Sequence, residues 1–210
     1  PILPIVDDED PVAVARAGGT PQLKELRMHQ GSIWWWNRPV FDPANGGHLR
    51  IEMRALPAGP TMKDMLANAA LAIGLAKLMQ SKVNDLLPAM PFTYCTANFY
   101  RAAQQGMDAE LFWPSLQQNQ PEYFPVGDIL EKLLPEIPDQ LEAMGFIRED
   151  FTPLISILEE RLANRQTGAQ WQLSKLAELR KDMHKQDALV AMYQQYQKNS
   201  ADNIPVAQWQ

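Results

Sequence analysis

Cysteine is nearly absent from this 210-residue sequence, which contains only Cys95. A single cysteine excludes an intramolecular disulfide and a structural zinc site built on several thiolates, and it fits a reducing compartment such as the cytoplasm. No sequence signature of a nucleophile surrounds Cys95, so we expect it to be a small, buried apolar residue.

Long apolar runs and an excess of basic residues are missing as well. The longest nearly apolar run, residues 65–76, is too short to span a bilayer, which takes about 20 residues. Lys and Arg number 19 against 25 Asp and Glu, for a net charge of −6. This balance argues against a general nucleic-acid binder and against binding to an anionic membrane. P-loop, Gly-x-Gly-x-x-Gly, His-Glu-x-x-His and Gly-x-Ser-x-Gly motifs are also absent.

The first 28 residues predict an irregular lead-in. Prolines recur, Gly18-Gly19 interrupts the chain, and the acidic run at residues 7–10 is expected to be a solvated surface segment. The stretch 29–57 that follows predicts a β-hairpin. Its first half is rich in Ile, Trp, Val and Phe, and Asn45-Gly46 supplies the turn chemistry that allows positive φ.

Apolar and polar residues alternate from residue 48 onward, which predicts a strand with two different faces. Leu49, Ile51 and Met53 should point to one face. The opposite face should then carry the polar residues His48, Arg50, Glu52 and Arg54.

Residues 60–198 predict a mainly helical body. Thr61 can cap a helix, with Asp64 three residues further on as a variant capping box. Apolar residues at helical spacing from Met62 to Leu78 predict a buried stripe, in which Leu66→Ala should be costly. Tight packing against a neighbour is expected at the small residues Ala67, Ala69, Ala70, Ala72 and Gly74.

Further helices are expected at 96–106, 127–134, 138–144 and 152–164, and a longer one at 169–197 with a break near His184. The Pro- and Gln-rich stretch 113–125 predicts a loop, and the tail 199–210 is expected to be frayed. The fold class that follows is α+β, with one antiparallel hairpin packed on a mainly helical body in a single domain, residues 1–210.

The hairpin also carries the residues that suggest chemistry. Residues 16–54 hold six basic and three acidic side chains, a local positive excess in an acidic protein. A glutamate between two arginines, as in Arg50-x-Glu52-x-Arg54, could bind a hard cation while an arginine clamps a phosphate. The alternative is a ladder of cross-strand salt bridges on a solvated sheet face.

Two further groups have competing interpretations. The tryptophans at 34–36 could stack on a ring, although strand alternation separates Trp35 from its neighbours and core packing is the alternative. A helix that begins at Gly168, close to Arg165, would present N–H groups to an anion, or the segment is a simple turn between helices.

These residues resemble the glutamate–cysteine ligase family, in particular its bacterial carboxylate–amine ligase-like branch. The similarity covers roughly residues 28–175, and its most specific part is Glu52-x-Arg54 followed by PAGPT at 57–61. The similar stretches are 29–39 (HQGSIWWWNRP), 48–61 (HLRIEMRALPAGPT), 91–92 (PF), 98–100 (NFY) and 167–172 (TGAQWQ).

The resemblance implies an ATP-dependent ligase that catalyses the first step of glutathione-type thiol synthesis. ATP would phosphorylate the γ-carboxylate of glutamate, and an amine such as cysteine would attack the acyl phosphate, with Mg²⁺ bridging the phosphates and the carboxylate. Glu52 then matches a metal ligand, and Arg54 matches the catalytic arginine that stabilises the phosphoryl group in transfer. Candidate contacts to substrate or nucleotide are Trp34, Trp36, Asn37, Arg38, Arg50 and Arg165.

Family enzymes are considerably longer, and their other metal carboxylates come from strands ahead of this region. The resemblance therefore predicts that the chain is the C-terminal part of a cytoplasmic ligase and is inactive without the N-terminal part. Its other partners would be ATP, glutamate and the amine, without nucleic acid or membrane, and a homo-oligomer stays open. The alternative is a non-catalytic helical interaction or scaffold module derived from the ligase fold.

Overall fold

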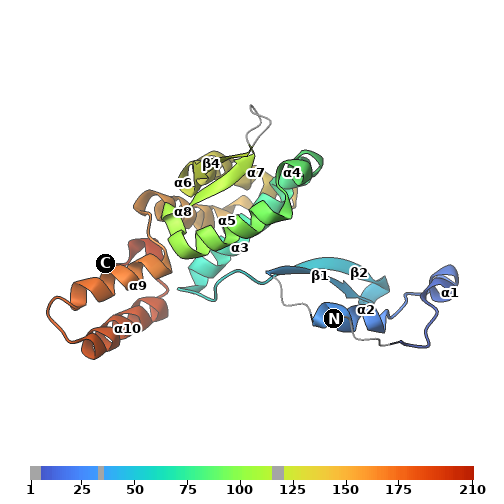
Figure 1. Cartoon of the computed structure of the whole chain (residues 1–210), viewed down its shortest axis with the longest axis horizontal. Helices are drawn as coiled ribbons and strands as arrows, with labels where there is room; N and C mark the ends of the chain where they lie inside the picture. The colour runs from blue at the N-terminus through green and yellow to red at the C-terminus, as the bar shows by residue number, and fades with distance from the viewer. Residues whose placement is uncertain (1–5, 33–35, 115–120) are drawn as a thin grey trace. The chain divides into compact units, whose positions relative to one another are not determined.

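The computed structural model describes residues 6–32, 36–114 and 121–210. Within these residues the fold is α+β, with two antiparallel hairpins and a mainly helical body, which confirms the predicted fold class (Figure 1). The chain divides into two compact units, unit 1 (Pro1–Leu56) and unit 2 (Pro57–Gln210).

Each unit has its own order of elements. Unit 1 contains α1 (Pro11–Arg16), α2 (Lys24–Gly31), β1 (Asn37–Asp42), the 3-10 turn η1 (Ala44–Gly46) and β2 (His48–Met53). Unit 2 begins with α3 (Met62–Gln80), α4 (Val83–Ala89), α5 (Phe92–Gln105), η2 (Gly106–Asp108), β3 (Glu110–Pro114) and β4 (Pro121–Pro125). It continues with α6 (Val126–Leu133), η3 (Leu134–Glu136), α7 (Ile137–Ala143), α8 (Arg148–Asn164), α9 (Gly168–Leu179), α10 (Lys185–Ala201) and η4 (Val206–Gln208).

The lead-in contains two helices, so the expectation of an irregular segment was wrong. The acidic residues at 7–10 also form hydrogen bonds and an ion pair that fix the backbone of this segment. Asp10 caps α1 through its side chain, and a carboxylate oxygen of Glu9 accepts the N–H of Gln22 at 2.9 Å. Asp7 pairs with Lys24, the first residue of α2, at 3.0 Å. The carboxylates therefore cap helices and close loops.

The predicted hairpin exists, but its first strand is shorter than expected. Residues 29–31 end α2, and β1 begins at Asn37 and pairs with β2 in an antiparallel register. The turn has the backbone conformation that the sequence predicts, because Asn45, Gly46 and Gly47 all have positive φ. Gly47 also has no room for a side chain, since a Cβ there would lie 2.8 Å from Cγ2 of Thr20.

Helix α3 packs through small residues and through large residues of its C-terminal half, such as Leu78. Thr61 caps the helix as expected, because its Oγ1 accepts the N–H of Asp64 at 3.1 Å. The small residues Ala67, Ala70 and Gly74 are buried, and α3 packs there against α7 and α8. Leu66 is 50% exposed, so the expectation that it lies in a buried stripe was wrong.

A methyl group added to Gly74 is expected to destabilise unit 2. A Cβ there would lie 2.5 Å from Cγ2 of Ile137, which is fully buried. Overpacking of this kind costs about 1–3 kcal/mol and outweighs the gain of about 1 kcal/mol in helix propensity. Gly74→Ala should therefore lower the denaturation midpoint of unit 2.

The control for this change is Gly31→Ala, at a helical glycine where an added Cβ meets nothing within 4 Å. It should leave the stability of unit 1 unchanged or slightly raised. Equal midpoints for Gly74→Ala and the wild type in chemical denaturation would show that α3 and α7 can separate at no cost.

The remaining helices of unit 2 follow the prediction closely, apart from three differences. The expected break near His184 is confirmed, because α9 ends at Leu179 and α10 begins just after His184. Helix α4 was not anticipated, and Cys95 is exposed on α5, not buried. The expected loop at 113–125 instead contains most of a second hairpin, β3–β4, and Asn98 of α5 accepts the N–H of Phe112 in β3 at 2.7 Å.

The C-terminal tail is ordered and largely buried, in contrast to the expected fraying. Val206 and Trp209 are at most 5% exposed. Gln166 donates to the carbonyl oxygens of Val206 and Trp209 at 2.7 and 2.9 Å. The Trp209 ring meets Trp171 edge-on at 4.9 Å between centroids. The tail is thus part of the core of unit 2.

None of the helices in the described segments has both the length and the hydropathy that a membrane crossing requires.

Candidate functional site

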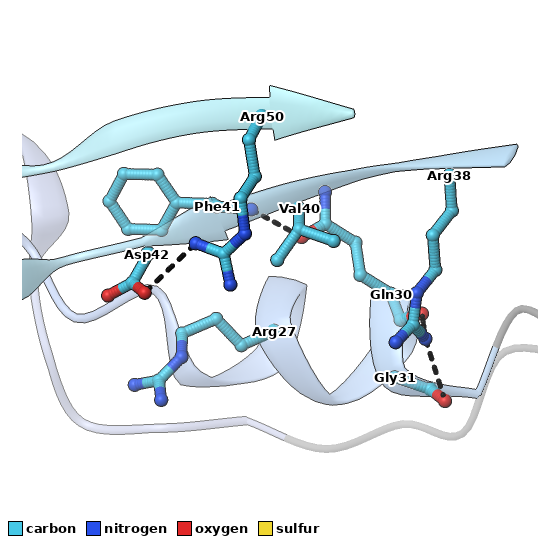
Figure 2. A pocket seen from close by; sticks show the side chains of 8 residues that line it. All are labelled: Arg27, Gln30, Gly31, Arg38, Val40, Phe41, Asp42 and Arg50. Carbon is cyan, nitrogen blue, oxygen red and sulfur yellow. Dashed lines mark hydrogen bonds and ion pairs between the residues drawn. The ribbon is translucent and has the colours of Figure 1, made fainter. Parts of the chain in front are cut away.

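The polar face of the β1–β2 hairpin lies against α2 and carries Arg38, Arg50 and Glu52, three of the residues selected from the sequence. The register places Arg38 opposite Glu52 and Val40 opposite Arg50. Figure 2 shows Arg38 and Arg50 extending from the strands toward α2. Strand alternation therefore brings the predicted arginines to one face, as expected.

The guanidinium group of Arg38 has partners both on the opposite strand and on α2. Its Nε pairs with the carboxylate of Glu52 across the strands. Its Nη1 donates to the carbonyl oxygens of Gln30 and Gly31, at 2.8 and 3.2 Å, at the end of α2. The Arg38–Glu52 pair is the cross-strand bridge that the ladder interpretation predicts, and the bonds to α2 fix the guanidinium beyond what a solvated ladder requires.

Arg50 is held more loosely. Its Nη1 donates to Oδ2 of Asp42 at 3.0 Å and lies 3.0 Å from Nε2 of His48. The pKa of Asp42 is lowered, first by the backbone N–H of Ala44 and then by Arg50. Asp42 is therefore ionised at neutral pH. Because half of the Arg50 side chain is exposed, this ion pair contributes little stability.

These side chains surround a pocket of about 180 Å³ between α2 and the hairpin. The pocket lining includes the guanidinium groups of Arg27, Arg38 and Arg50, together with a single carboxylate from Asp42 (Figure 2). Arg27 is exposed and has no ion pair within the described part of the chain. The pocket therefore has an excess of positive charge.

Among the lining residues that were not selected from the sequence, Arg27 and Gln30 have polar side chains that reach the pocket from α2. Gln30 also fixes the pocket wall, because its side-chain oxygen accepts the N–H of Phe41 at 3.1 Å. Both residues lie on α2, in a stretch expected to be irregular or extended. Their spacing of three residues, which places them on one side of a helix, was the signal available.

The other selected residues have different positions. Arg54 is exposed one residue past the end of β2, where its backbone N–H donates to the carbonyl oxygen of Trp36 at 2.9 Å. Trp36 is half-buried, Asn37 is exposed, and Trp34 lies outside the described residues. Arg54 is not among the residues that line the pocket, although alternation gives it the same face as Arg50 and Glu52.

Arg165 belongs to unit 2, where it has partners of its own. Its Nη2 donates to the carbonyl oxygen of Met107 at 2.8 Å and to Asp108 at 2.7 Å. The next residue, Gln166, binds the C-terminal segment through its side chain. Thr167 caps α9 by accepting the N–H of Gln170. The turn interpretation of this cluster therefore fits better than an anion site at the start of α9.

Glu52, the residue matched to a metal ligand, does not belong to a cluster of metal-binding side chains in the described part of the chain. Within residues 6–32, 36–114 and 121–210, no group of three or more His, Cys, Asp or Glu side chains is placed to hold a metal ion. On the pocket face, Glu52 is engaged by Arg38 and Asp42 by Arg50. Mg²⁺ is usually bound by one or two carboxylates together with water molecules and substrate phosphates, so a magnesium ion on this face would need oxygen ligands from the substrate and solvent as well.

The charges of the pocket indicate what it can bind. Guanidinium groups offer paired N–H donors that match the oxygens of phosphate and carboxylate groups. Three of them around one pocket favour an anion with several oxygens over a neutral or cationic ligand.

Comparison of the chain with family models, with curated proteins and with solved structures found no match.

Proposed function

We propose that this chain is part of a cytoplasmic ATP-dependent carboxylate–amine ligase of the glutamate–cysteine ligase type, and that unit 1 binds the phosphate groups of ATP. In such a reaction ATP transfers its γ-phosphoryl group to a carboxylate and ADP leaves. An amine then attacks the acyl phosphate, and the new C–N bond replaces the bond to phosphate. Glutamate and an amine such as cysteine are the substrates that this assignment implies.

The observation that carries the proposal is the group of three arginines around one pocket in a protein of net charge −6. Arg38 is fixed by Glu52 and by two carbonyl oxygens of α2, so its guanidinium is oriented before a ligand arrives. Preorganised donors of this kind suit phosphoryl transfer, which depends mainly on positioning and charge stabilisation.

The two remaining arginines can change partners when a phosphate enters. The Arg50–Asp42 pair is exposed and weak, so exchanging the carboxylate for a phosphate oxygen costs little. Arg27 reaches the same pocket from α2. A polyphosphate would thus meet one fixed and two adjustable cations, and its binding should depend strongly on salt.

Titration of the chain with tripolyphosphate, without magnesium, tests this assignment. We expect weak, saturable binding with Kd in the millimolar range, weakening further as salt is added. Arg50→Gln should weaken binding by about tenfold or more, since it removes one charge-assisted donor. Isothermal titration calorimetry at two salt concentrations is the measurement.

The matched control is Arg148→Gln, which removes the same charge from an exposed ion-pair group of unit 2. It should leave tripolyphosphate binding unchanged. Absence of binding to the wild type, or equal affinities for the wild type and Arg50→Gln, would contradict a phosphate site in unit 1.

A helical interaction or scaffold module is the second candidate, and the observation that favours it is the separate core of unit 2. Buried residues from α3, η3, α7 and α8, all within unit 2, form this core. A folded chain that fails to bind tripolyphosphate would favour the module over the ligase.

A further inference from the structure

Unit 2 contains an apolar cavity that the proposed ligase function does not use. Its volume is about 170 Å³, and it lies among α3, η2, α6, η3 and α8. The wall is formed mainly by Leu71, Met107, Leu130, Leu134, Leu158 and Leu162. Leu134 and Leu158 are buried and the other four residues are partly exposed, so the cavity is open to solvent on one side.

The charged side chain that lines this cavity, Arg161, is ion-paired to Asp64, and its Nε is buried without a hydrogen-bond partner in the described part of the chain. Arg161 forms part of the wall, but its Nη1 and Nη2 donate to Asn68 at 2.6 Å and to Asp64 at 2.8 Å. No carboxylate is among the residues that line the cavity. A cationic ligand would therefore lose its hydration without gaining an opposite charge, and a carboxylate would have to compete with Asp64 for the guanidinium of Arg161.

The volume sets the size of the ligand. Enclosed apolar cavities of about 150 Å³ bind benzene, so a partly open cavity of similar volume can hold the apolar body of a ligand of that size. We propose that the cavity of unit 2 binds a small, uncharged, apolar molecule or group of about six carbon atoms. Such a ligand fills the space between α3, α6 and α8 and should stabilise unit 2, because it binds the folded state alone.

The test uses three probes with the same six-carbon body, namely hexan-1-ol, hexanoate and hexylammonium. Hexan-1-ol should bind the wild-type chain saturably and raise its melting temperature. Each charged probe should bind at least about tenfold more weakly. Magnetisation transfer in NMR from the probe to leucine methyl groups locates binding in the cavity without any substitution.

The second part of the test uses a substitution that fills the cavity with a larger side chain. Leu130→Phe should weaken hexan-1-ol binding by about tenfold or more, since the larger ring occupies the space. The control is Leu173→Phe, the same substitution at a leucine that is 66% exposed on α9, which should leave binding unchanged. If Leu130→Phe does not fold, Leu71→Phe fills the same cavity from α3.

Three results would overturn the proposal. One is a wild-type chain without saturable hexan-1-ol binding or transfer to leucine methyl groups. Another is hexanoate or hexylammonium binding as tight as that of hexan-1-ol. The last is full affinity in a folded variant with a filled cavity.

Discussion

Asp64→Ala is expected to lower the free energy of unfolding by about 3–5 kcal/mol, because it leaves a buried charge without its partner. Asp64 is fully buried, and its Oδ1 accepts a bond from Arg161 at 2.8 Å. Its other oxygen accepts the hydroxyl of Thr61 at 2.7 Å and the N–H of Val206 at 3.1 Å. One carboxylate thus ties together α3, α8 and the C-terminal segment.

Two variants separate this network from ordinary surface charge. Asp139→Ala breaks an ion pair with Arg148 in which Asp139 is 78% exposed, and it should cost less than about 1 kcal/mol. Adding Arg161→Met to Asp64→Ala should restore most of the lost stability, because neither charge is then buried alone. A denaturation midpoint of Asp64→Ala equal to that of Asp139→Ala would contradict this account of the network.

Arg54→Lys is expected to reduce kcat by about 10²–10³-fold in the longer enzyme that the proposed function requires. Lysine keeps the charge but loses the planar fork that grips two phosphate oxygens at once. If Arg54 acts on the phosphoryl group in transfer, kcat falls and KM for glutamate changes little. Steady-state kinetics and a thermal melt on the same preparation measure both effects.

A surface role for Arg54 predicts a different result. An exposed arginine beyond the end of a strand contributes at most about 1 kcal/mol to stability, and lysine replaces it well. Turnover equal to that of the wild type would show that Arg54 is a surface residue without a catalytic role. The proposed phosphate site would then consist of the arginines of the pocket alone.

The hairpin could be predicted from the sequence because its signals are local. The alternation of Leu49, Ile51 and Met53 and the Asn45-Gly46 turn are both contained in one short stretch, and the structure has the corresponding strand and turn. The pocket could not be predicted in full, because Arg27 and Gln30 approach the hairpin from a helix that was not expected.

The order of the C-terminal tail could not be predicted from the sequence for a different reason. Its residues look polar and irregular, yet Val206 donates to Asp64, which lies 142 positions earlier in the chain. A contact at this separation leaves no periodic pattern in the tail itself. The second hairpin was missed for a local reason, because the prolines at 114, 121 and 125 resemble loop chemistry although they end the paired strands β3 and β4.

The most direct test of the proposed ligase follows a heavy oxygen isotope from the carboxylate of glutamate in the longer enzyme. If the carboxylate is phosphorylated by ATP and the amine then displaces phosphate, one carboxylate oxygen must leave with the phosphate. We predict that each inorganic phosphate released with the amide product contains one labelled oxygen. Amide formation with unlabelled phosphate, or release of phosphate that does not depend on glutamate, would contradict the acyl-phosphate reaction and the function proposed for this chain.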